Sequence, residues 1–192
     1  TMVSVAEARA RFGLPLDQPV GLFLGNREPY RGLDCLLEGL ASLDDPEVLP
    51  GVVAVAGPDR EQIARTARVR PLGRVEDVAT LLTAVDFVIN VNRFSLFDLS
   101  LIEALESGAP VLLHETGGNR AFSRLGAGCV MMRDLAPSTV ADGLERMFAS
   151  RSSELAALAD RSRTCYGQHL TIEAFRHTHR TLYASTARSA CA

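Results

Sequence analysis

The sequence has little net charge of either sign. Its 20 lysines and arginines are offset by 23 acidic residues, which leaves a formal net charge of -3. Proteins that bind nucleic acid or anionic membrane surfaces usually carry an excess of basic residues, because these ligands are polyanions. We therefore expect no nucleic-acid partner, and any cation that binds a ligand must act locally.

Paired cysteines, metal-ligand clusters and long apolar runs are also missing. Cys35, Cys129, Cys165 and Cys191 form no CxxC pair and have no histidine at metal-ligand spacing, so we expect reduced thiols and no metal. No apolar run approaches the roughly 20 residues of a membrane span. The first residues also lack the charged and apolar segments of a signal peptide. These absences predict a cytoplasmic chain without a transmembrane segment.

What the sequence does contain is a regular alternation of short aliphatic runs and longer helical patterns. Hydrophobic residues make up 47% of the chain, enough for a buried core. We predict an α/β fold: a Rossmann-like doubly wound parallel sheet of about six strands with helices on both faces, plus a C-terminal helical extension. The strand-like runs lie at 20–24, 52–56, 69–72, 87–91, 111–113 and 129–131.

Helical periodicity fills the segments between these runs. We assign residues 1–150 to the sheet domain and residues 151–192 to a C-terminal helical extension of the same domain. The first helical segment resembles a connection from an earlier element, so we expect the chain to be a fragment of a longer protein. The predicted helices cover residues 5–12, 34–43, 76–84, 100–107, 138–149 and 171–184.

In an open α/β sheet, ligands bind in the loops that follow the carboxyl ends of the strands. The loop after the first predicted strand contains Gly25, which permits close backbone approach, and then Asn26, Arg27 and Arg31. Either arginine could pair with phosphate oxygens, and the alternative is that both are solvated. The loop matches neither a Walker motif nor GxGxxG.

The most informative segment is 92–111, which follows the fourth predicted strand. Glu103 falls in the apolar row formed by Leu99, Ile102 and Leu105 of a predicted helix. A bare carboxylate there would be costly unless it accepts hydrogen bonds, for example from vicinal hydroxyl groups of a ligand. We therefore predict that Glu103 contacts a ligand.

Glycines mark three further loops. Gly57 and Gly73 follow the second and third predicted strands and, taken alone, are only turn signals. After the fifth strand, Thr116, Gly117 and Gly118 would leave backbone N–H groups free at the start of a helix. Such groups suit an anion or a sugar, and a plain glycine-rich turn is the alternative.

These segments, in this order and spacing, resemble the C-terminal domain of the retaining GT-B glycosyltransferases, which include bacterial mannosyl- and glucosyltransferases and glycogen synthases. The resemblance covers residues 11–149 and is strongest at 11–15, 25–32, 56–57, 72–73 and 101–111. It implies that residues 1–150 bind a nucleotide diphosphate sugar as the donor substrate, without a further cofactor. It also implies that a hexosyl group is transferred with retention.

The resemblance carries roles over to individual positions. In the family, an arginine and a lysine of the first loop hold the donor diphosphate. Arg31 matches the lysine, while Asn26, next to Arg27, stands at the arginine position. The family also has two glutamates separated by seven residues. Glu103 matches the one that binds the ribose hydroxyls, and Ser95 replaces the one near the transferred sugar.

The end of the site that would face the transferred sugar departs from the family pattern. Leu96 and Asp98 also stand at positions that are usually glycine, so this end is either specialised for an unusual sugar or degraded. The family's N-terminal, acceptor-binding domain lies outside this chain, so we expect an incomplete enzyme that requires such a domain or a partner subunit. The candidate residues here are Ser95, Leu96, Phe97, Asp98 and Leu99.

Two other interpretations stay open. The first is a non-catalytic, glycosyltransferase-like partner or nucleotide-sensing module, which the replacement at Ser95 favours. The second is a different doubly wound domain, such as an epimerase-like or receiver-like fold, which rests on fold-level analogy alone. A receiver would require clustered aspartates after the first strand, and this chain has none there.

Overall fold

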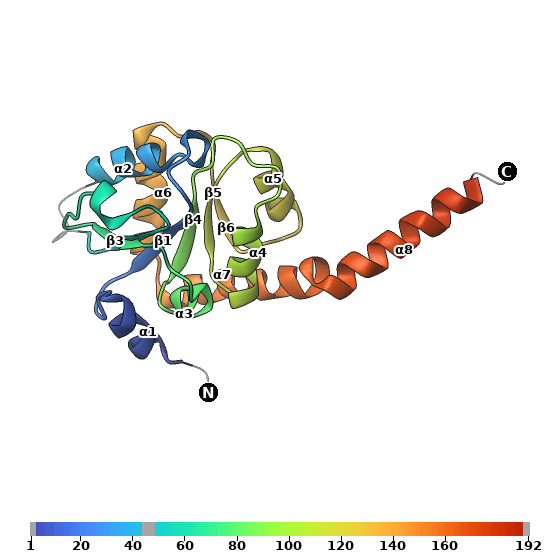
Figure 1. The fold of residues 1–192 in the computed structure, drawn as a ribbon, viewed down its shortest axis with the longest axis horizontal. Helices are drawn as coiled ribbons and strands as arrows, with labels where there is room; N and C mark the ends of the chain where they lie inside the picture. Colours follow the sequence, from blue (N-terminus) through green and yellow to red (C-terminus); the bar gives the residue numbers. More distant parts are fainter. Residues whose placement is uncertain (1–2, 44–48, 190–192) are drawn as a thin grey trace.

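The computed structural model describes residues 3–43 and 49–189, whose centre is a parallel sheet (Figure 1). The strand order is β3-β2-β1-β4-β5-β6. Each strand coincides with a predicted aliphatic run apart from single residues at some ends, so the predicted Rossmann-like sheet is confirmed. The strands are β1 (Val20–Leu24), β2 (Val52–Ala56), β3 (Val69–Gly73), β4 (Phe87–Asn90), β5 (Val111–His114) and β6 (Cys129–Met132).

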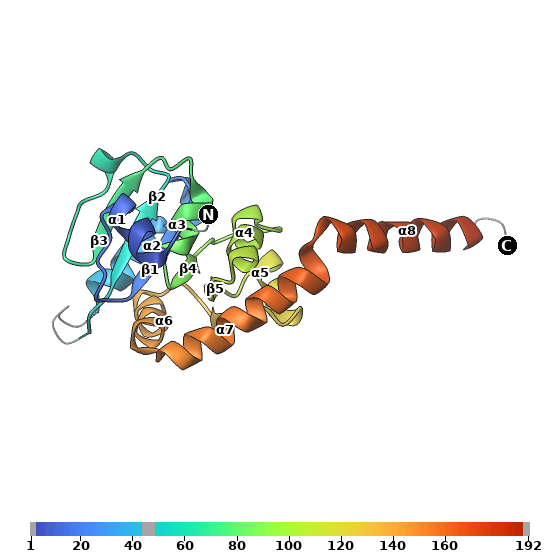
Figure 2. The ribbon, with the colours of Figure 1, turned by 90° about the horizontal axis from the view of Figure 1, so that it is seen from below.

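Helices cover both faces of this sheet, as Figures 1 and 2 show. On one face α2 (Leu33–Ala41) and α6 (Pro137–Ala149) pack against each other and against the strands. Because both faces are covered, the strands have continuous rather than alternating apolar residues. The other face carries α1 (Val5–Phe12), α3 (Val78–Thr83), α4 (Leu99–Ser107) and α5 (Gly117–Arg124).

Several helices begin or end away from the predicted positions. The prediction of a helix from residue 76 was wrong, because the Asp77 side chain accepts a hydrogen bond from the Thr80 N–H at 3.1 Å and α3 starts only after this cap. Asp98 caps α4 in the same way, so α4 starts at Leu99. Gly108, at φ 83°, ends it as predicted.

The N-terminal helix α1 is fixed to the sheet by one buried side chain, Arg9. Its Nη2 atom lies 2.7 Å from Asp86 Oδ2, and its Nε donates to the Ala84 carbonyl oxygen at 3.0 Å. A third bond joins Nη1 to the Pro15 carbonyl oxygen at 3.0 Å. Asp86 also accepts the N–H of Val20 at the start of β1. Arg9 therefore ties α1 to the strand that leads into the first loop.

The C-terminal part of the chain leaves the body of the domain. Helix α7 (Ser152–Cys165) packs along the sheet domain, and a π-helical turn, η3 (Tyr166–Leu170), leads into α8 (Ile172–Ser189). Figures 1 and 2 both show α8 projecting away from the sheet. No helix of the described residues is long and apolar enough to cross a membrane. The apolar side chains that α8 exposes are Ile172, Phe175, Leu182 and Tyr183.

Candidate functional site

The strand order reverses between β1 and β4, which places a crevice at the carboxyl edge of the sheet. The loops after these strands touch, since the Arg93 N–H donates to the Tyr30 carbonyl oxygen at 2.7 Å. A Cβ atom at Gly32, where φ is +68°, would lie 2.1 Å from the Val91 carbonyl oxygen. Only glycine allows this approach. The two loops therefore form one continuous wall.

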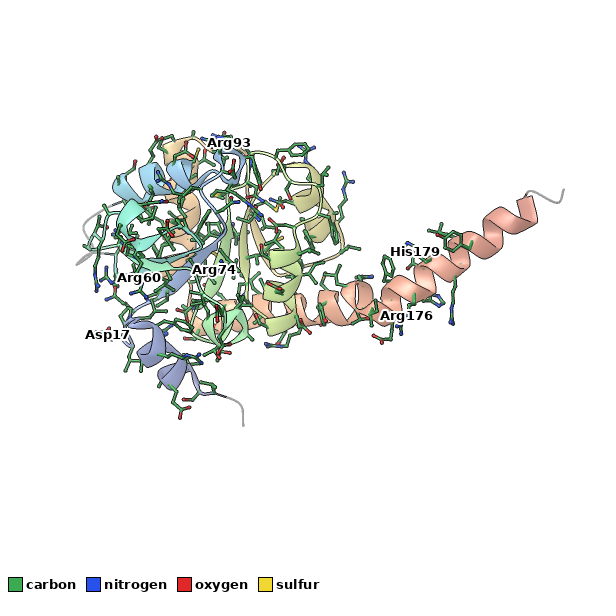
Figure 3. All side chains as sticks on the ribbon, viewed as in Figure 1. Asp17, Arg60, Arg74, Arg93, Arg176 and His179 are labelled. Carbon is green, nitrogen blue, oxygen red and sulfur yellow. The ribbon has the colours of Figure 1, made fainter. Side chains whose placement is uncertain are left out.

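Arg93 strengthens this wall by tying the loop after β4 to α2. Its guanidinium forms two hydrogen bonds with the Asp34 carboxylate, at 2.9 and 2.6 Å. Figure 3 labels Arg93 well apart from Arg60 and Arg74, which follow β2 and β3. Its charge is thus used within the protein, so we assign Arg93 a structural role.

A hollow of about 460 Å³ lies where the two loops meet. Phe97 stacks on Phe122 of α5, with ring centroids 4.7 Å apart, and so anchors one side of it. The structure thus brings Arg31 of the first loop and the whole stretch 95–99 to one place, at the carboxyl ends of the strands as expected. The predicted site residues that line the hollow are Arg31, Ser95, Leu96, Phe97, Asp98 and Leu99.

The carboxylate of Asp98 is the centre of the hydrogen bonding here, although only 8% of its side chain is exposed. Oδ2 accepts hydrogen bonds from Arg31 Nη1 at 2.7 Å, Asn92 Nδ2 at 2.8 Å and Asn90 Nδ2 at 3.0 Å. Oδ1 accepts the N–H and hydroxyl of Ser100 at 3.2 and 2.9 Å. Burial raises the pKa of the Asp98 carboxyl, but Ser100, the Arg31 charge and Asn92 together hold that pKa below its usual value. Asp98 is therefore an ionised internal anion.

Arg31 lies in the hollow, but its charge is already paired. The Nη1 atom contacts Asp98, and the guanidinium lies 5.3 Å from the centre of the Tyr30 ring. Its Nε atom is buried and has no hydrogen-bond partner among the described residues. The sequence reasoning named Arg31 as a phosphate ligand and missed this internal pairing.

Three buried asparagines support the same spot, and the sequence reasoning missed them as well. Asn90 and Asn92 stand at the end of β4, and Asn119 of α5 is completely buried. Asn119 Nδ2 donates to Asn90 Oδ1 at 3.1 Å and to the His114 carbonyl oxygen at 2.9 Å. Amides at the end of an otherwise apolar strand were the available signal, because buried polar groups require partners.

The glycines at the start of α5 pack against the backbone of the loop after β4. The Gly118 N–H donates to the Ser95 carbonyl oxygen at 2.7 Å, so the prediction that this N–H is free was wrong. A Cβ atom at Gly118 would lie 1.6 Å from the Leu96 carbonyl oxygen, and one at Gly117 would lie 2.4 Å from that of Ser95. Thr116, the N-cap residue, makes no side-chain cap. The start of α5 therefore holds the stretch 95–97 in place.

Gly25, Gly57 and Gly73 meet at the carboxyl ends of β1, β2 and β3. The Gly57 N–H donates to the Gly73 carbonyl oxygen at 2.9 Å, and the Gly25 N–H donates to the Ala56 carbonyl oxygen at 3.0 Å. A Cβ atom at Gly57 would lie 2.0 Å from the Gly25 carbonyl oxygen. What the sequence showed as separate turn signals is one tightly packed backbone cluster.

Asn26 and Arg27 are exposed and lie apart from the Arg31 hollow. The Asn26 side chain accepts the Glu28 N–H at 3.2 Å. Arg27 lines a second hollow, of about 250 Å³, together with Asp34 and other residues of the α2 side. The two arginines of the first loop therefore face different hollows.

The prediction that Glu103 lies in an apolar row was wrong. Glu103 is exposed, and Leu99, the supposed start of the row, is 72% exposed. The face of α4 that packs on the sheet consists of Leu101, Ala104 and Leu105 instead. Glu103 consequently needs no donor to offset burial, and its carboxylate is open to solvent.

A parallel sheet of this order, with helices on both faces, defines a Rossmann-like α/β domain. The fold matches sucrose-phosphate synthase from Thermosynechococcus elongatus with a TM-score of 0.76 at 21% identity, covering 98% of this chain and 50% of that one. It matches Anabaena HepE, solved in complex with UDP and glucose, with a TM-score of 0.76 at 19% identity, covering 93% and 51%.

The chain belongs to the glycosyl transferases group 1 family, because the model of that family matches residues 18–150. It is 29% identical over 163 residues to D-inositol 3-phosphate glycosyltransferase of Streptomyces bingchenggensis, covering 75% of this chain and 36% of that protein. It is 32% identical over 122 residues to the same-named protein of Mycobacterium bovis, covering 58% and 25%. The chain therefore spans between 25% and 36% of the length of these relatives.

Proposed function

We propose that this chain binds the nucleotide diphosphate sugar of a hexosyltransferase that acts with retention. The observation that carries the proposal is the hollow at the switch point, where Arg31 lies beside the start of α4 in a chain of the glycosyl transferases group 1 family. Cations and helix starts of this kind stabilise phosphate groups. That a similar fold, HepE, was solved with UDP and glucose supports the proposal.

Each candidate residue has a proposed role in this function. Arg31 and, from the same loop, Asn26 and Arg27 would face the diphosphate, whose leaving charge must be stabilised during transfer. Glu103 would accept hydrogen bonds from the ribose hydroxyls. The remaining positions would let the backbone approach the ligand or line the sugar; they are Gly25, Gly57, Gly73, Ser95, Leu96, Phe97, Asp98, Leu99, Thr116, Gly117 and Gly118.

Calorimetric titration with UDP, GDP and ADP tests the proposal. We expect saturable binding of one nucleotide by the wild-type chain. Glu103→Ala should weaken this binding by about 1.5 to 3 kcal/mol, because a hydrogen bond to a charged group is lost. Glu106→Ala is the matched control, since Glu106 lies on the same helix, is exposed and accepts its hydrogen bond from Tyr166 at 2.8 Å. Binding of no nucleotide would refute the donor-binding role, and equal affinity of the Glu103 variant would refute the ribose assignment.

We further propose that activity requires an N-terminal acceptor-binding domain or a partner subunit. The chain covers only about half of each of the two solved glycosyltransferases, 50% and 51%. The exposed apolar side chains of α8 supply a surface that such a partner would cover.

The isolated chain should sediment as a monomer, because Arg176 and Arg180 of α8 would repel those of a second copy. Sedimentation velocity of the wild type and of Phe175→Asp measures this. Phe175 is 55% exposed, so the substitution should leave the free energy of unfolding unchanged. A wild-type dimer that the substitution dissociates would show that a second copy covers α8 instead.

A second candidate function is a non-catalytic partner or nucleotide-sensing module. The serine at position 95 and the internal pairing of Arg31 with Asp98 favour it. In this case nucleotide binding would persist, but the chain combined with an acceptor-binding partner would release no free nucleotide from a nucleotide sugar. Release of nucleotide in that assay, lost in Glu103→Ala, would exclude this alternative.

A further inference from the structure

The hollow contains an anion site that the protein fills with its own side chain. Three N–H donors, from Arg31, Asn90 and Asn92, converge on one oxygen of Asp98 within 3.0 Å. The other oxygen accepts the first-turn N–H of α4. A cation, amide donors and the start of a helix are the groups with which proteins bind ligand anions. Here the bound anion is the Asp98 carboxylate.

Two of these donor side chains, those of Arg31 and Asn92, belong to residues that line the hollow. Asp98 lines it as well, and the Arg31 side chain is 24% exposed. An anionic group that enters the hollow therefore meets a guanidinium whose charge is already neutralised. It also meets the negative charge of Asp98 itself. A ligand oxygen that takes the place of Asp98 at Arg31 Nη1 has to displace that carboxylate.

We propose that Asp98 is an affinity-setting residue that competes with the phosphate groups of the ligand for Arg31 and Asn92. The wild-type chain then binds these phosphates more weakly than a chain without this carboxylate. The inference rests on the proposed function only in taking phosphate as the anionic group. If Asp98 were only a structural cap of α4, removing its carboxylate would weaken ligand binding. The proposed competition predicts the opposite, namely tighter binding.

Asp98→Asn tests the proposal, because asparagine has nearly the same size and caps helices equally well but carries no charge. The probes are inorganic pyrophosphate and UDP, titrated by calorimetry. We expect the variant to bind pyrophosphate about 10-fold more tightly or better, the change expected when a charged hydrogen bond is no longer in competition. In an Arg31→Gln background the same substitution should give a much smaller gain, because only the competition for Asn92 and the repulsion by the Asp98 charge are then removed.

Equal or weaker pyrophosphate binding by folded Asp98→Asn would overturn the proposal, as would a gain of undiminished size in the Arg31→Gln background. Asp98→Ser, which also keeps a capping side chain, replaces the asparagine variant if the latter does not fold. A readout on the wild type is the NMR signal of the Arg31 Nε–H group. It should shift on addition of millimolar pyrophosphate, and an unchanged signal would overturn the proposal.

The outcomes separate this inference from the donor-binding role. If neither chain binds a nucleotide but Asp98→Asn gains pyrophosphate binding, the competition by Asp98 stands and the donor-binding role fails. If the wild type binds a nucleotide and the variant binds both probes no more tightly, the donor-binding role stands and the competition by Asp98 is refuted.

Discussion

Replacing Arg9 by methionine is expected to lower the free energy of unfolding by about 3 kcal/mol, at the lower end of the range for breaking a buried ion pair. Methionine keeps the apolar contacts of the arginine stem but leaves Asp86 without its cation. The loss stays at the lower end because the Asp86 side chain is 32% exposed and can still meet water. The carbonyl oxygens of Ala84 and Pro15 also lose their donors. Urea denaturation followed by circular dichroism measures the change.

Arg11→Met is the matched control for this prediction. Arg11 lies on the same helix and forms the same kind of ion pair, with Asp77 at 2.6 Å, but the two side chains are 56% and 38% exposed. Exposed pairs contribute about 0.2 to 1 kcal/mol. Similar losses for the two variants would show that the burial of Arg9 does not determine its effect.

Gly118→Ala is expected to damage both the fold and the hollow. The new Cβ atom would lie 1.6 Å from the Leu96 carbonyl oxygen, so the stretch 95–97 has to move away from α5. The movement breaks the hydrogen bond from the Gly118 N–H to the Ser95 carbonyl oxygen. Overpacking of this kind costs about 1 to 3 kcal/mol of stability. Nucleotide affinity should fall by about 10-fold or more, equivalent to about 1.4 kcal/mol.

Gly167→Ala makes the same chemical change at a helical position where, apart from its own helix backbone, no atom of the described residues lies within 4 Å of the new Cβ. Alanine there should leave nucleotide affinity unchanged and stabilise the chain by about 0.5 to 1 kcal/mol, since glycine is the poorer helix former. Urea unfolding and calorimetry are applied to both variants. If Gly118→Ala behaved like Gly167→Ala, the close contact between α5 and the loop would not shape the hollow.

The strands could be predicted from the sequence because burial on both faces leaves an unambiguous pattern. In β2 all five residues, Val52–Ala56, are apolar and buried. The rule that ligands bind in the loops after the carboxyl ends of parallel strands also identified which loops meet, since this rule depends on strand direction and not on side-chain detail. The general place of the candidate site followed from topology alone.

The side-chain partners within that place could not be predicted. Arg31 and Asp98 are 67 positions apart, and nothing in either local sequence marks the other as its partner. For Glu103 the error lay in the phase of a short helix. The predicted apolar row began at Leu99, whereas α4 packs on the sheet through Leu101 and Leu105. The buried face of α4 is therefore rotated about the helix axis relative to the predicted one, and Glu103 lies on the exposed side.

The central position of β1, between β2 and β4, also governs when the hollow can form during folding. Strands β1, β2 and β3 follow one another along the chain and pair as neighbours. The pairing of Gly21 with Phe87 must instead close a long loop, which slows folding because chain entropy is lost before the contact forms. During synthesis the first loop therefore emerges with half of the sheet well before the residues that complete the hollow, and a nascent chain acquires the hollow only late.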